Sequence, residues 1–156
     1  MHVPTVLTLS ALVIRDDAGR LLLVRKRGTS KFMQPGGKLE PGESFAAAAV
    51  RELEEELGIR VAERELTDMG RWYGAAANET DTFIDAGIFS CETHQPPVAA
   101  AEIEEVLWLH PDEARARNDL APLLTDHILP LLAEAAAWSA HGSASSASSA
   151  AGGARD

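Results

Sequence analysis

The sequence predicts one domain of mixed α and β structure, and two features carry that prediction. Of its 156 residues, 46% are hydrophobic, which is enough to build one buried core. The apolar residues fall into short β-branched and aliphatic runs bounded by turn residues, a pattern typical of strands. The first two runs flank the turn at 16–19 and are expected to form a hairpin. We expect strands at Val6–Ile14, Arg20–Val24, Leu66–Tyr73, Thr82–Cys91 and Glu105–Leu109.

The clearest helix signal covers Phe45–Leu57. Ser44 can cap its first turn with its hydroxyl oxygen, and Gly58 can end it in the left-handed conformation. Apolar residues recur along it every three or four positions, which predicts one side that faces a core. That side consists of Ala46, Val50, Leu53 and Leu57.

Two further helices are expected near the C-terminus, over Pro111–Arg117 and Asp119–Trp138. Pro122 suits the first turn of the second helix, whereas Pro130 is expected to kink or split it. From residue 139 onward the composition changes to Ser, Ala and Gly without a large apolar side chain. Such a segment cannot bury enough surface to offset its ordering entropy. We therefore expect a folded domain over 1–138 and a disordered tail over 139–156.

The charge distribution indicates a small anionic ligand. The net charge of −10 argues against a binder of nucleic-acid polymers and against a membrane-surface protein. Basic residues are concentrated between Arg15 and Lys38, where seven of them stand against two acidic residues. This stretch could attract a small anion, while the acidic remainder of the chain suggests that cations also take part.

The cellular location expected from the sequence is the cytoplasm. No apolar run approaches the roughly 20 residues that a membrane helix needs. The N-terminal apolar stretch has no basic leader, which disfavours a signal peptide. Cys91 is the single cysteine and cannot form an intramolecular disulfide, which fits a reducing compartment.

Three glutamates on the central helix are the first candidates for chemistry. Glu52, Glu55 and Glu56 are spaced three and four residues apart, so their carboxylates share one side of the helix. Two unit charges about 5 Å apart repel by roughly 3 kcal/mol at an effective dielectric constant near 20. The arrangement therefore favours a bound cation, a raised pKa or full exposure to water. All-oxygen ligands suit Mg²⁺, with Mn²⁺ as an alternative.

The loop before this helix supports a site at that place. Gly36 and Gly37 can adopt backbone conformations that bring carbonyl groups close to the helix. Arg51 is placed to reach back to Glu43, which would fasten the loop onto the helix. Without this loop, the glutamates would be read equally well as a solvated helix surface.

The spacing from Gly37 to Ile59 resembles the Nudix box at every specified position. It comprises Gly37, five residues, Glu43, seven residues, Arg51-Glu52-Leu53, one residue, Glu55-Glu56, one residue and Gly58-Ile59. Average residue usage gives a chance match on the order of 10⁻⁹ for each possible start point. The resemblance implies an α/β/α sandwich with a mixed sheet and a catalytic loop–helix motif. It also implies hydrolysis of a nucleoside diphosphate linked to a further group, with divalent cations.

The same resemblance implies roles for individual residues. Glu52, Glu55 and Glu56 match the metal-binding glutamates, and Gly36 matches the glycine whose carbonyl often completes the coordination. An acidic residue before a Trp-containing strand often adds a metal ligand or general base. Glu102 fits that position best and Glu105 second, so Glu55, Glu56 and Glu102 are the expected catalytic residues. Gly37, Glu43, Arg51 and Gly58 are expected to shape the motif.

Substrate contacts are predicted at seven positions, each with a simpler alternative. Phosphate groups would be bound by basic residues that could otherwise serve only solubility: Arg25, Arg27 and Lys38. The family resemblance places the base between residues just before the double glycine and residues after the Trp strand. Stacking would involve Phe32 or Met33, unless these only pack in a core. Base-edge hydrogen bonds would come from residues that could instead cap a helix: Asn118 and Asp119.

Within this resemblance, the short chain and the Pro35-Gly36-Gly37-Lys38 loop favour a nucleoside-triphosphate pyrophosphohydrolase, with oxidised nucleotides among the candidate substrates. A hydrolase of dinucleoside polyphosphates or other nucleotide derivatives is the alternative, and so is a non-catalytic nucleotide-sensing module. An isoprenoid-diphosphate isomerase is disfavoured, because Cys91 lies in no matching motif. The expected partner is a small nucleotide, and a homodimer is compatible with the sequence.

Overall fold

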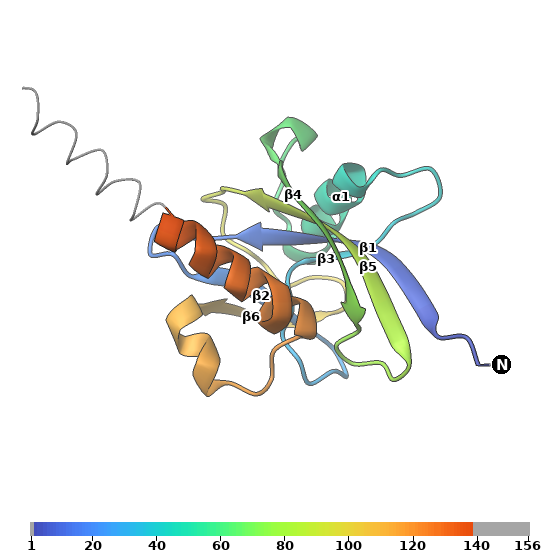
Figure 1. The fold of residues 1–156 in the computed structure, drawn as a ribbon. Coiled ribbons are helices and arrows are strands. Elements are labelled where there is room, and N and C mark those ends of the chain that lie inside the picture. Colours follow the sequence, from blue (N-terminus) through green and yellow to red (C-terminus); the bar gives the residue numbers. More distant parts are fainter. Residues whose placement is uncertain (1, 139–156) are drawn as a thin grey trace, which may run out of the picture.

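The computed structural model describes residues 2–138, so the predicted tail at 139–156 lies outside the described residues. Figure 1 shows strands enclosed between a short helix and a longer C-terminal helix. None of the described helices is long and apolar enough to cross a membrane. The strands are β1 (Thr5–Ile14), β2 (Leu21–Lys26), β3 (Gly36–Lys38), β4 (Thr67–Ala75), β5 (Thr82–Cys91) and β6 (Ile103–Leu109). The helical segments are α1 (Phe45–Leu57), η1 (Glu63–Glu65), η2 (Pro111–Ala116) and η3 (Leu123–Ile128).

Two sheets form the centre of the molecule. The larger has the strand order β3-β1-β5-β4, and the smaller pairs β2 with β6. β1 and β5 run parallel from Thr5 opposite Thr82 to Ile14 opposite Cys91, whereas β3 and β4 are antiparallel to their neighbours. The larger sheet is therefore mixed, as predicted.

The expected hairpin between β1 and β2 is wrong beyond its turn. The Asp16 carboxylate accepts hydrogen bonds from the backbone N–H groups of Ala18 and Arg20, which closes the turn. After one antiparallel bridge between Arg15 and Leu21, the two strands join different sheets. β2 is buried on both faces over Leu21–Val24. Its apolar pattern therefore predicts a strand but does not show that β6 is the strand with which it pairs.

Two apolar cores lie on opposite sides of the strands, which makes the fold the predicted α/β/α sandwich. Alternate residues of β1 supply both cores because successive strand side chains point to opposite faces. Leu12 and Ile14 pack in the core that includes α1, and Ala11 and Val13 pack in the core that includes the C-terminal helix.

α1 begins and ends where the sequence predicts. The Ser44 hydroxyl oxygen accepts a hydrogen bond from the backbone N–H of Ala47 at 3.0 Å. Gly58 has φ = 68° and donates its N–H to the Glu54 carbonyl, which ends the helix in the left-handed conformation. Leu53 and Leu57 are completely buried, so one side of α1 is fixed against the sheets. The opposite side remains available for the site.

The C-terminal helix spans 122–138 and is not split by Pro130. Its first part, Leu123–Ile128, is π-helical, and the N–H of Leu129 donates to the carbonyl of Leu124, five residues earlier. This wider turn comes just before Pro130, where a proline ring would otherwise meet the carbonyl four residues earlier. The predicted split at Pro130 is therefore wrong. The helix begins at residue 122, three residues after the predicted start at Asp119.

We predict that Leu53→Ala lowers the free energy of unfolding by about 2–5 kcal/mol, because Leu53 is fully buried and its removal leaves a cavity. Urea unfolding followed by circular dichroism measures this change. Glu54→Ala, one residue along α1 in an exposed pair with Arg60, is the control and should change stability by about 0.5 kcal/mol or less. Equal losses in the two variants would contradict the assignment of the core side.

Candidate active site

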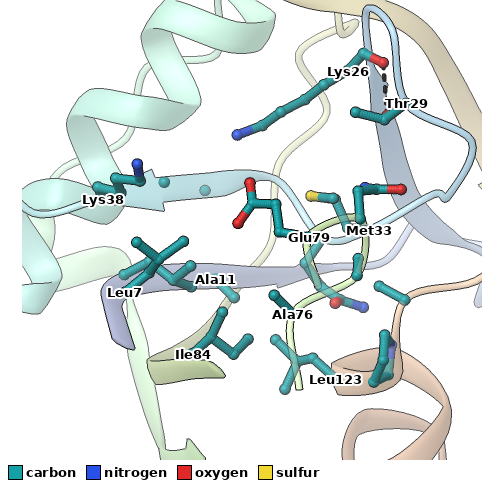
Figure 2. Close-up of a pocket in the computed structure, with 18 of the residues that line it drawn as sticks. Leu7, Ala11, Lys26, Thr29, Met33, Lys38, Ala76, Glu79, Ile84 and Leu123 are labelled. Atoms are coloured by element: carbon teal, nitrogen blue, oxygen red, sulfur yellow. Dashed lines mark hydrogen bonds between the residues drawn. The ribbon is translucent and has the colours of Figure 1, made fainter. Parts of the chain in front are cut away.

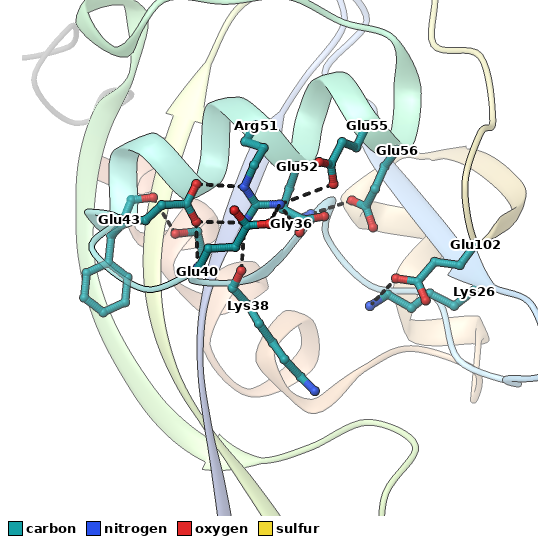
Figure 3. Close-up of polar contacts among 12 residues, drawn as sticks. Lys26, Gly36, Lys38, Glu40, Glu43, Arg51, Glu52, Glu55, Glu56 and Glu102 are labelled. Carbon is teal, nitrogen blue, oxygen red and sulfur yellow. Dashed lines mark hydrogen bonds and ion pairs between the residues drawn. The ribbon is translucent and has the colours of Figure 1, made fainter.

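Arg51 fastens the 36–44 loop to α1 (Figure 3). Its Nε donates to Glu43 Oε2 at 2.7 Å, and its Nη2 donates to Glu43 Oε1 at 2.8 Å and to the Lys38 carbonyl at 2.9 Å. Glu43 Oε1 also accepts the backbone N–H of Glu40. The Arg51 hydrogen bonds, together with that N–H, lower the pKa of Glu43 to about 2. The contact expected between Arg51 and Glu43 is thus present as a bidentate pair.

The two glycines of the motif are each required for a different steric reason. Gly36 has φ = 146°, and a Cβ there would overlap the backbone carbonyl of Ser10 on the neighbouring strand β1. A Cβ on Gly37 would lie 2.5 Å from the carboxyl carbon of Glu52. Gly36 therefore lets β3 pair with β1, and Gly37 lets the loop approach the carboxylate of Glu52.

Glu56 is a buried carboxyl group with one oxygen left open. Its side chain is 1% exposed, and Oε1 accepts the backbone N–H of Gly36 at 2.9 Å. Within residues 2–138, Oε2 has no hydrogen-bond partner. Burial raises the pKa of Glu56 to about 8, although the Gly36 N–H and Lys26 both favour the ionised form. A buried carboxyl oxygen with no hydrogen-bond partner fits the role of a cation ligand.

The other two candidate glutamates of α1, Glu52 and Glu55, accept hydrogen bonds from Arg51. Its Nη1 donates to Glu52 Oε1 at 2.8 Å and to Glu55 Oε2 at 3.2 Å. Burial raises the pKa of Glu52, and the Arg51 contact opposes that rise. Glu55 is about half exposed. In the described part of the chain, no three acidic, His or Cys side chains already converge on one point. The all-oxygen donor set fits a hard cation, and the hydrogen bonds of Arg51 engage one oxygen of each of these two carboxylates.

Glu102 lies on the side of Glu56 away from Arg51 (Figure 3). Its Oε1 is 3.2 Å from Lys26 Nζ, and its negative charge contributes to the raised pKa of Glu56. Glu105, the second candidate, instead accepts hydrogen bonds from Arg25. The structure therefore brings Glu102 to the site and leaves Glu105 paired elsewhere.

A cavity opens beside this cluster, between β1, β3 and the start of the C-terminal helix. Figure 2 shows Lys26 and Lys38 along one side and apolar side chains along the opposite side. The backbone of Gly36 and Gly37 forms part of the wall, so the cavity adjoins the residue that binds Glu56. Its apolar lining includes Leu7, Leu9, Ala11, Ala76, Ile84 and Leu123. Its polar side chains include Lys26, Gln34, Lys38, Asn78 and Glu79.

Two of the seven residues predicted to bind substrate, Met33 and Lys38, line this cavity. Arg25 and Arg27 lie outside the lining. Arg25 binds the Thr29 carbonyl as well as Glu105, and Arg27 is largely exposed, 3.8 Å from Glu104.

The other three predicted substrate contacts also lie outside the lining. Phe32 is buried, and the guanidinium group of Arg117 lies 5.4 Å from its ring centre. Arg117 also pairs with Asp119 at 2.8 Å, and Asn118 is exposed. The burial of Phe32 matches its alternative role of core packing. The alternative of helix capping is not found for Asn118 and Asp119, because the helix has no side-chain cap and Asp119 pairs with Arg117.

Sequence reasoning missed Lys26 and Gln34 as residues of this site. Lys26 belongs to the basic stretch, but nothing in its spacing separates it from Arg25 and Arg27, which point elsewhere. Gln34 offered no signal either, because it stands in a mostly polar loop and its burial depends on the strands packed around it.

The family follows from comparison with known proteins. Residues 5–131 match the family model described as the NUDIX domain. The chain belongs to the Nudix family. An uncharacterized Nudix hydrolase of Yersinia pestis is 35% identical over 116 residues, covering 69% of this chain and 60% of that protein. The chain thus spans about three fifths of the length of the curated relatives that it matches first.

Solved Nudix-related structures share the fold. The solution structure of the Escherichia coli ORF135 protein has a TM-score of 0.67 and 27% identity, covering 86% of this chain and 94% of that one. The crystal structure of the MutT protein from Methanosarcina mazei has a TM-score of 0.65 and 23% identity, covering 77% and 88%. Nudix proteins generally use divalent cations, and α1 presents carboxylate oxygens of the kind that such cations prefer.

We predict that Gly36→Ala destabilises the protein more than Gly37→Ala. The first change forces a Cβ against the backbone of β1 at a positive φ, and we expect a loss of at least about 1–3 kcal/mol in the free energy of unfolding. The second meets only the flexible end of Glu52, which can move away. Urea unfolding of both variants tests this order. A larger loss for Gly37→Ala would contradict the proposed division of roles.

The metal-free protein should lose stability as the pH rises from about 5 to 8.5. The pKa of Glu56 rises from 4.5 to about 8 on folding, so the folded state holds a proton that the unfolded state has released. Its contribution, roughly 1.4 kcal/mol for each pKa unit, is complete below pH 4.5 and disappears through pH 8. Urea unfolding in EDTA should show a few kcal/mol of decline, and Glu56→Gln should remove most of it. Parallel pH profiles for the two proteins would refute this assignment.

Proposed function

We propose that the protein is a Mg²⁺-dependent hydrolase that cleaves a phosphoric anhydride bond of nucleoside triphosphates. The observation that carries this proposal is the buried, half-partnered carboxyl group of Glu56. Gly36, whose N–H is hydrogen-bonded to Glu56, also forms part of the wall of the cavity. Residues of several strands and of the C-terminal helix line this cavity. A cation position therefore adjoins a place for an organic group.

Charge complementarity supports a polyphosphate at the boundary between the proposed cation site and the cavity. Lys26 and Lys38 enter the cavity from the side nearest α1, and both can contact phosphate oxygens. The glutamates of α1 would repel the same phosphates. A divalent cation, when bound, would neutralise that repulsion, polarise the phosphorus–oxygen bonds and lower the pKa of an attacking water. We assign its ligands to the carbonyl of Gly36 and the carboxylates of Glu52, Glu55, Glu56 and Glu102.

Individual residues then have distinct tasks in this proposal. Glu56 is fixed by the Gly36 N–H, so its open oxygen stays aimed away from the loop. Glu102 is held near it by Lys26 and can accept a proton from water or bind the cation. Arg51 positions the loop and restrains Glu52 and Glu55 until a stronger cation competes for them.

A nucleoside triphosphate fits the cavity better than a larger dinucleotide. The apolar wall formed by Leu7, Ile84 and Leu123 suits one flat heterocyclic group. The basic side chains lie near the Gly36–Lys38 strand and leave that apolar end for the base.

We predict that Glu56→Gln lowers kcat by at least about 100-fold while the protein stays folded. Glutamine keeps the acceptor for the Gly36 N–H but has no charge with which to hold a cation. Turnover with Mg²⁺ can be followed by chromatography of the products from each nucleoside triphosphate. Glu54→Gln is the matched control on the same helix and should retain activity within about threefold, because Glu54 pairs with Arg60 on the surface.

The substrate assay should include dinucleoside polyphosphates, oxidised nucleotides and nucleotide sugars beside the ordinary triphosphates. Preference for a dinucleoside polyphosphate would replace the proposed substrate class but keep the cation site. Wild-type activity in Glu56→Gln would reject the role assigned to this carboxylate. Nucleotide binding with Mg²⁺ but without any hydrolysis would favour the sensing module.

A further inference from the structure

The segment between β5 and β6 is tied to the end of α1. Residues 95–101, which we call the strap, run past the last turn of the helix. The backbone N–H of Val98 donates to the Leu57 carbonyl at 3.0 Å, and that of Ala100 donates to the Glu56 carbonyl at 2.9 Å. Carbonyl groups at a helix C-terminus have no partner within the helix itself. The strap therefore satisfies the end of α1 and takes its position from the helix that carries the proposed cation ligands.

The beginning of the strap is fixed as well as its end. The Gln95 carboxamide donates from Nε2 to the Arg60 carbonyl at 2.8 Å and accepts the Arg60 N–H at 3.0 Å. Pro96 and Pro97 follow, and their rings restrict the backbone φ angles. The strap thus reaches β6 with little freedom, so its last residues decide where the next side chains point.

Ala101 adopts a backbone conformation that alanine rarely takes. Its φ is 53°, in the left-handed region, where a residue with a Cβ is strained. The N–H of Ile103 donates to the Ala100 carbonyl at 3.0 Å, which makes Ala101 the first central residue of a tight turn. A turn with a positive φ at this position normally has Gly, Asn or Asp there. Ala101 is exposed, so packing of its methyl group does not explain the strain.

The strained turn presents Glu102. This residue is the second central residue of the turn, and its carbonyl accepts the N–H of Arg27 at 2.7 Å. Its carboxylate lies beside Lys26, with Oε1 3.2 Å from Nζ (Figure 3). Because Ala100 and Glu102 are both hydrogen-bonded through their backbones, a negative φ at the residue between them would break one of these contacts. The conformation of Ala101 therefore sets where the Glu102 carboxylate lies.

We infer that Ala101 is a positioning residue, which holds Glu102 at the cation site through its left-handed conformation. This inference rests on the proposed function, because it takes Glu102 to be a cation ligand or proton acceptor there. Backbone strain persists only where the surrounding contacts over-determine it, and it is frequent at functional sites. Here the hydrogen bonds of the strap and of Arg27 supply that constraint. Glu102 is thus placed relative to the same helix that carries the other carboxylates.

The test compares Ala101→Val with Ala101→Asn. Valine is β-branched and opposes a positive φ, whereas asparagine has a similar size and tolerates it. We expect Ala101→Val to weaken Mn²⁺ binding to the nucleotide-free protein roughly tenfold, the lower end of the range for loss of a residue that orients a metal ligand. Ala101→Asn should bind Mn²⁺ within about threefold of the wild-type affinity, because it keeps the turn. Electron paramagnetic resonance of free Mn²⁺ during titration measures these affinities without any turnover.

Ala99→Val is the matched control. Ala99 is an exposed residue of the same strap, and its φ is not positive. The variant should therefore keep the wild-type affinity for Mn²⁺. In EDTA, Ala101→Val should lower Tm by only about 2–4 °C, so the protein stays folded during the titration. Equal losses of Mn²⁺ affinity in Ala99→Val and Ala101→Val would overturn the inference, and so would wild-type affinity in Ala101→Val.

A double-mutant cycle separates the positioning of Glu102 from a general structural role. Because Ala101 acts through Glu102 in this proposal, Ala101→Val should change Mn²⁺ affinity little further in a Glu102→Gln background. Asparagine at position 101 should restore the dependence of Mn²⁺ affinity on Glu102. A tenfold loss from Ala101→Val in both backgrounds would show that the strain supports only the fold, which would refute the positioning role.

Failure of the proposed hydrolysis would be recognised separately. A wild-type protein whose Mn²⁺ affinity depends on Glu102 and on Ala101, but which cleaves no nucleotide, would support the positioning role and contradict the proposed function. Hydrolysis that is lost in Glu56→Gln, together with unchanged Mn²⁺ affinity and turnover in Ala101→Val, would support the proposed function and overturn the inference.

Discussion

The bidentate pair between Arg51 and Glu43 is the interaction on which the arrangement of the site depends. Arg51 rises from a helix that is anchored by fully buried leucines, so its position is set by the core. Through Glu43 and the Lys38 carbonyl, it holds the end of the loop against α1, and the Gly36 N–H bound to Glu56 holds its beginning. Planar guanidinium geometry suits this task, because one side chain can bind several oxygens in fixed directions. Lysine could not replace these contacts.

Arg51 also reduces the electrostatic repulsion among the glutamates of α1. α1 carries its glutamates close together, and their mutual repulsion would be unfavourable without a positive charge. Arg51 supplies that charge for Glu52 and Glu55, while Glu56 meets the problem by burial and a raised pKa. Arg51 and burial thus compensate the charges of these three carboxyl groups in different ways, and Glu56 Oε2 has no hydrogen-bond partner within residues 2–138.

Among the described residues, the Glu56 Oε2 atom and the Gln34 amide are buried without hydrogen-bond partners, and Gln34 lines the cavity whose wall includes Gly36. Each would be costly in a protein interior that had no further purpose for it. Glu56 accepts the N–H of Gly36, and Gln34 lies two residues before Gly36 in the lining of the cavity. The candidate cation site and the cavity therefore meet at the Gly36 backbone.

The sequence by itself determined the local elements and the family motif. Helix α1, its caps and the Arg51–Glu43 contact depend on residues within about fifteen positions, and short-range spacing describes such contacts well. The tertiary structure decided what depends on partners distant in the chain. It paired β2 with β6, brought Glu102 and not Glu105 to Glu56, and turned Arg25 away from the cavity. It also buried Gln34 between two sheets, because burial is a property of everything packed around a residue and no pattern of neighbours along the chain records it.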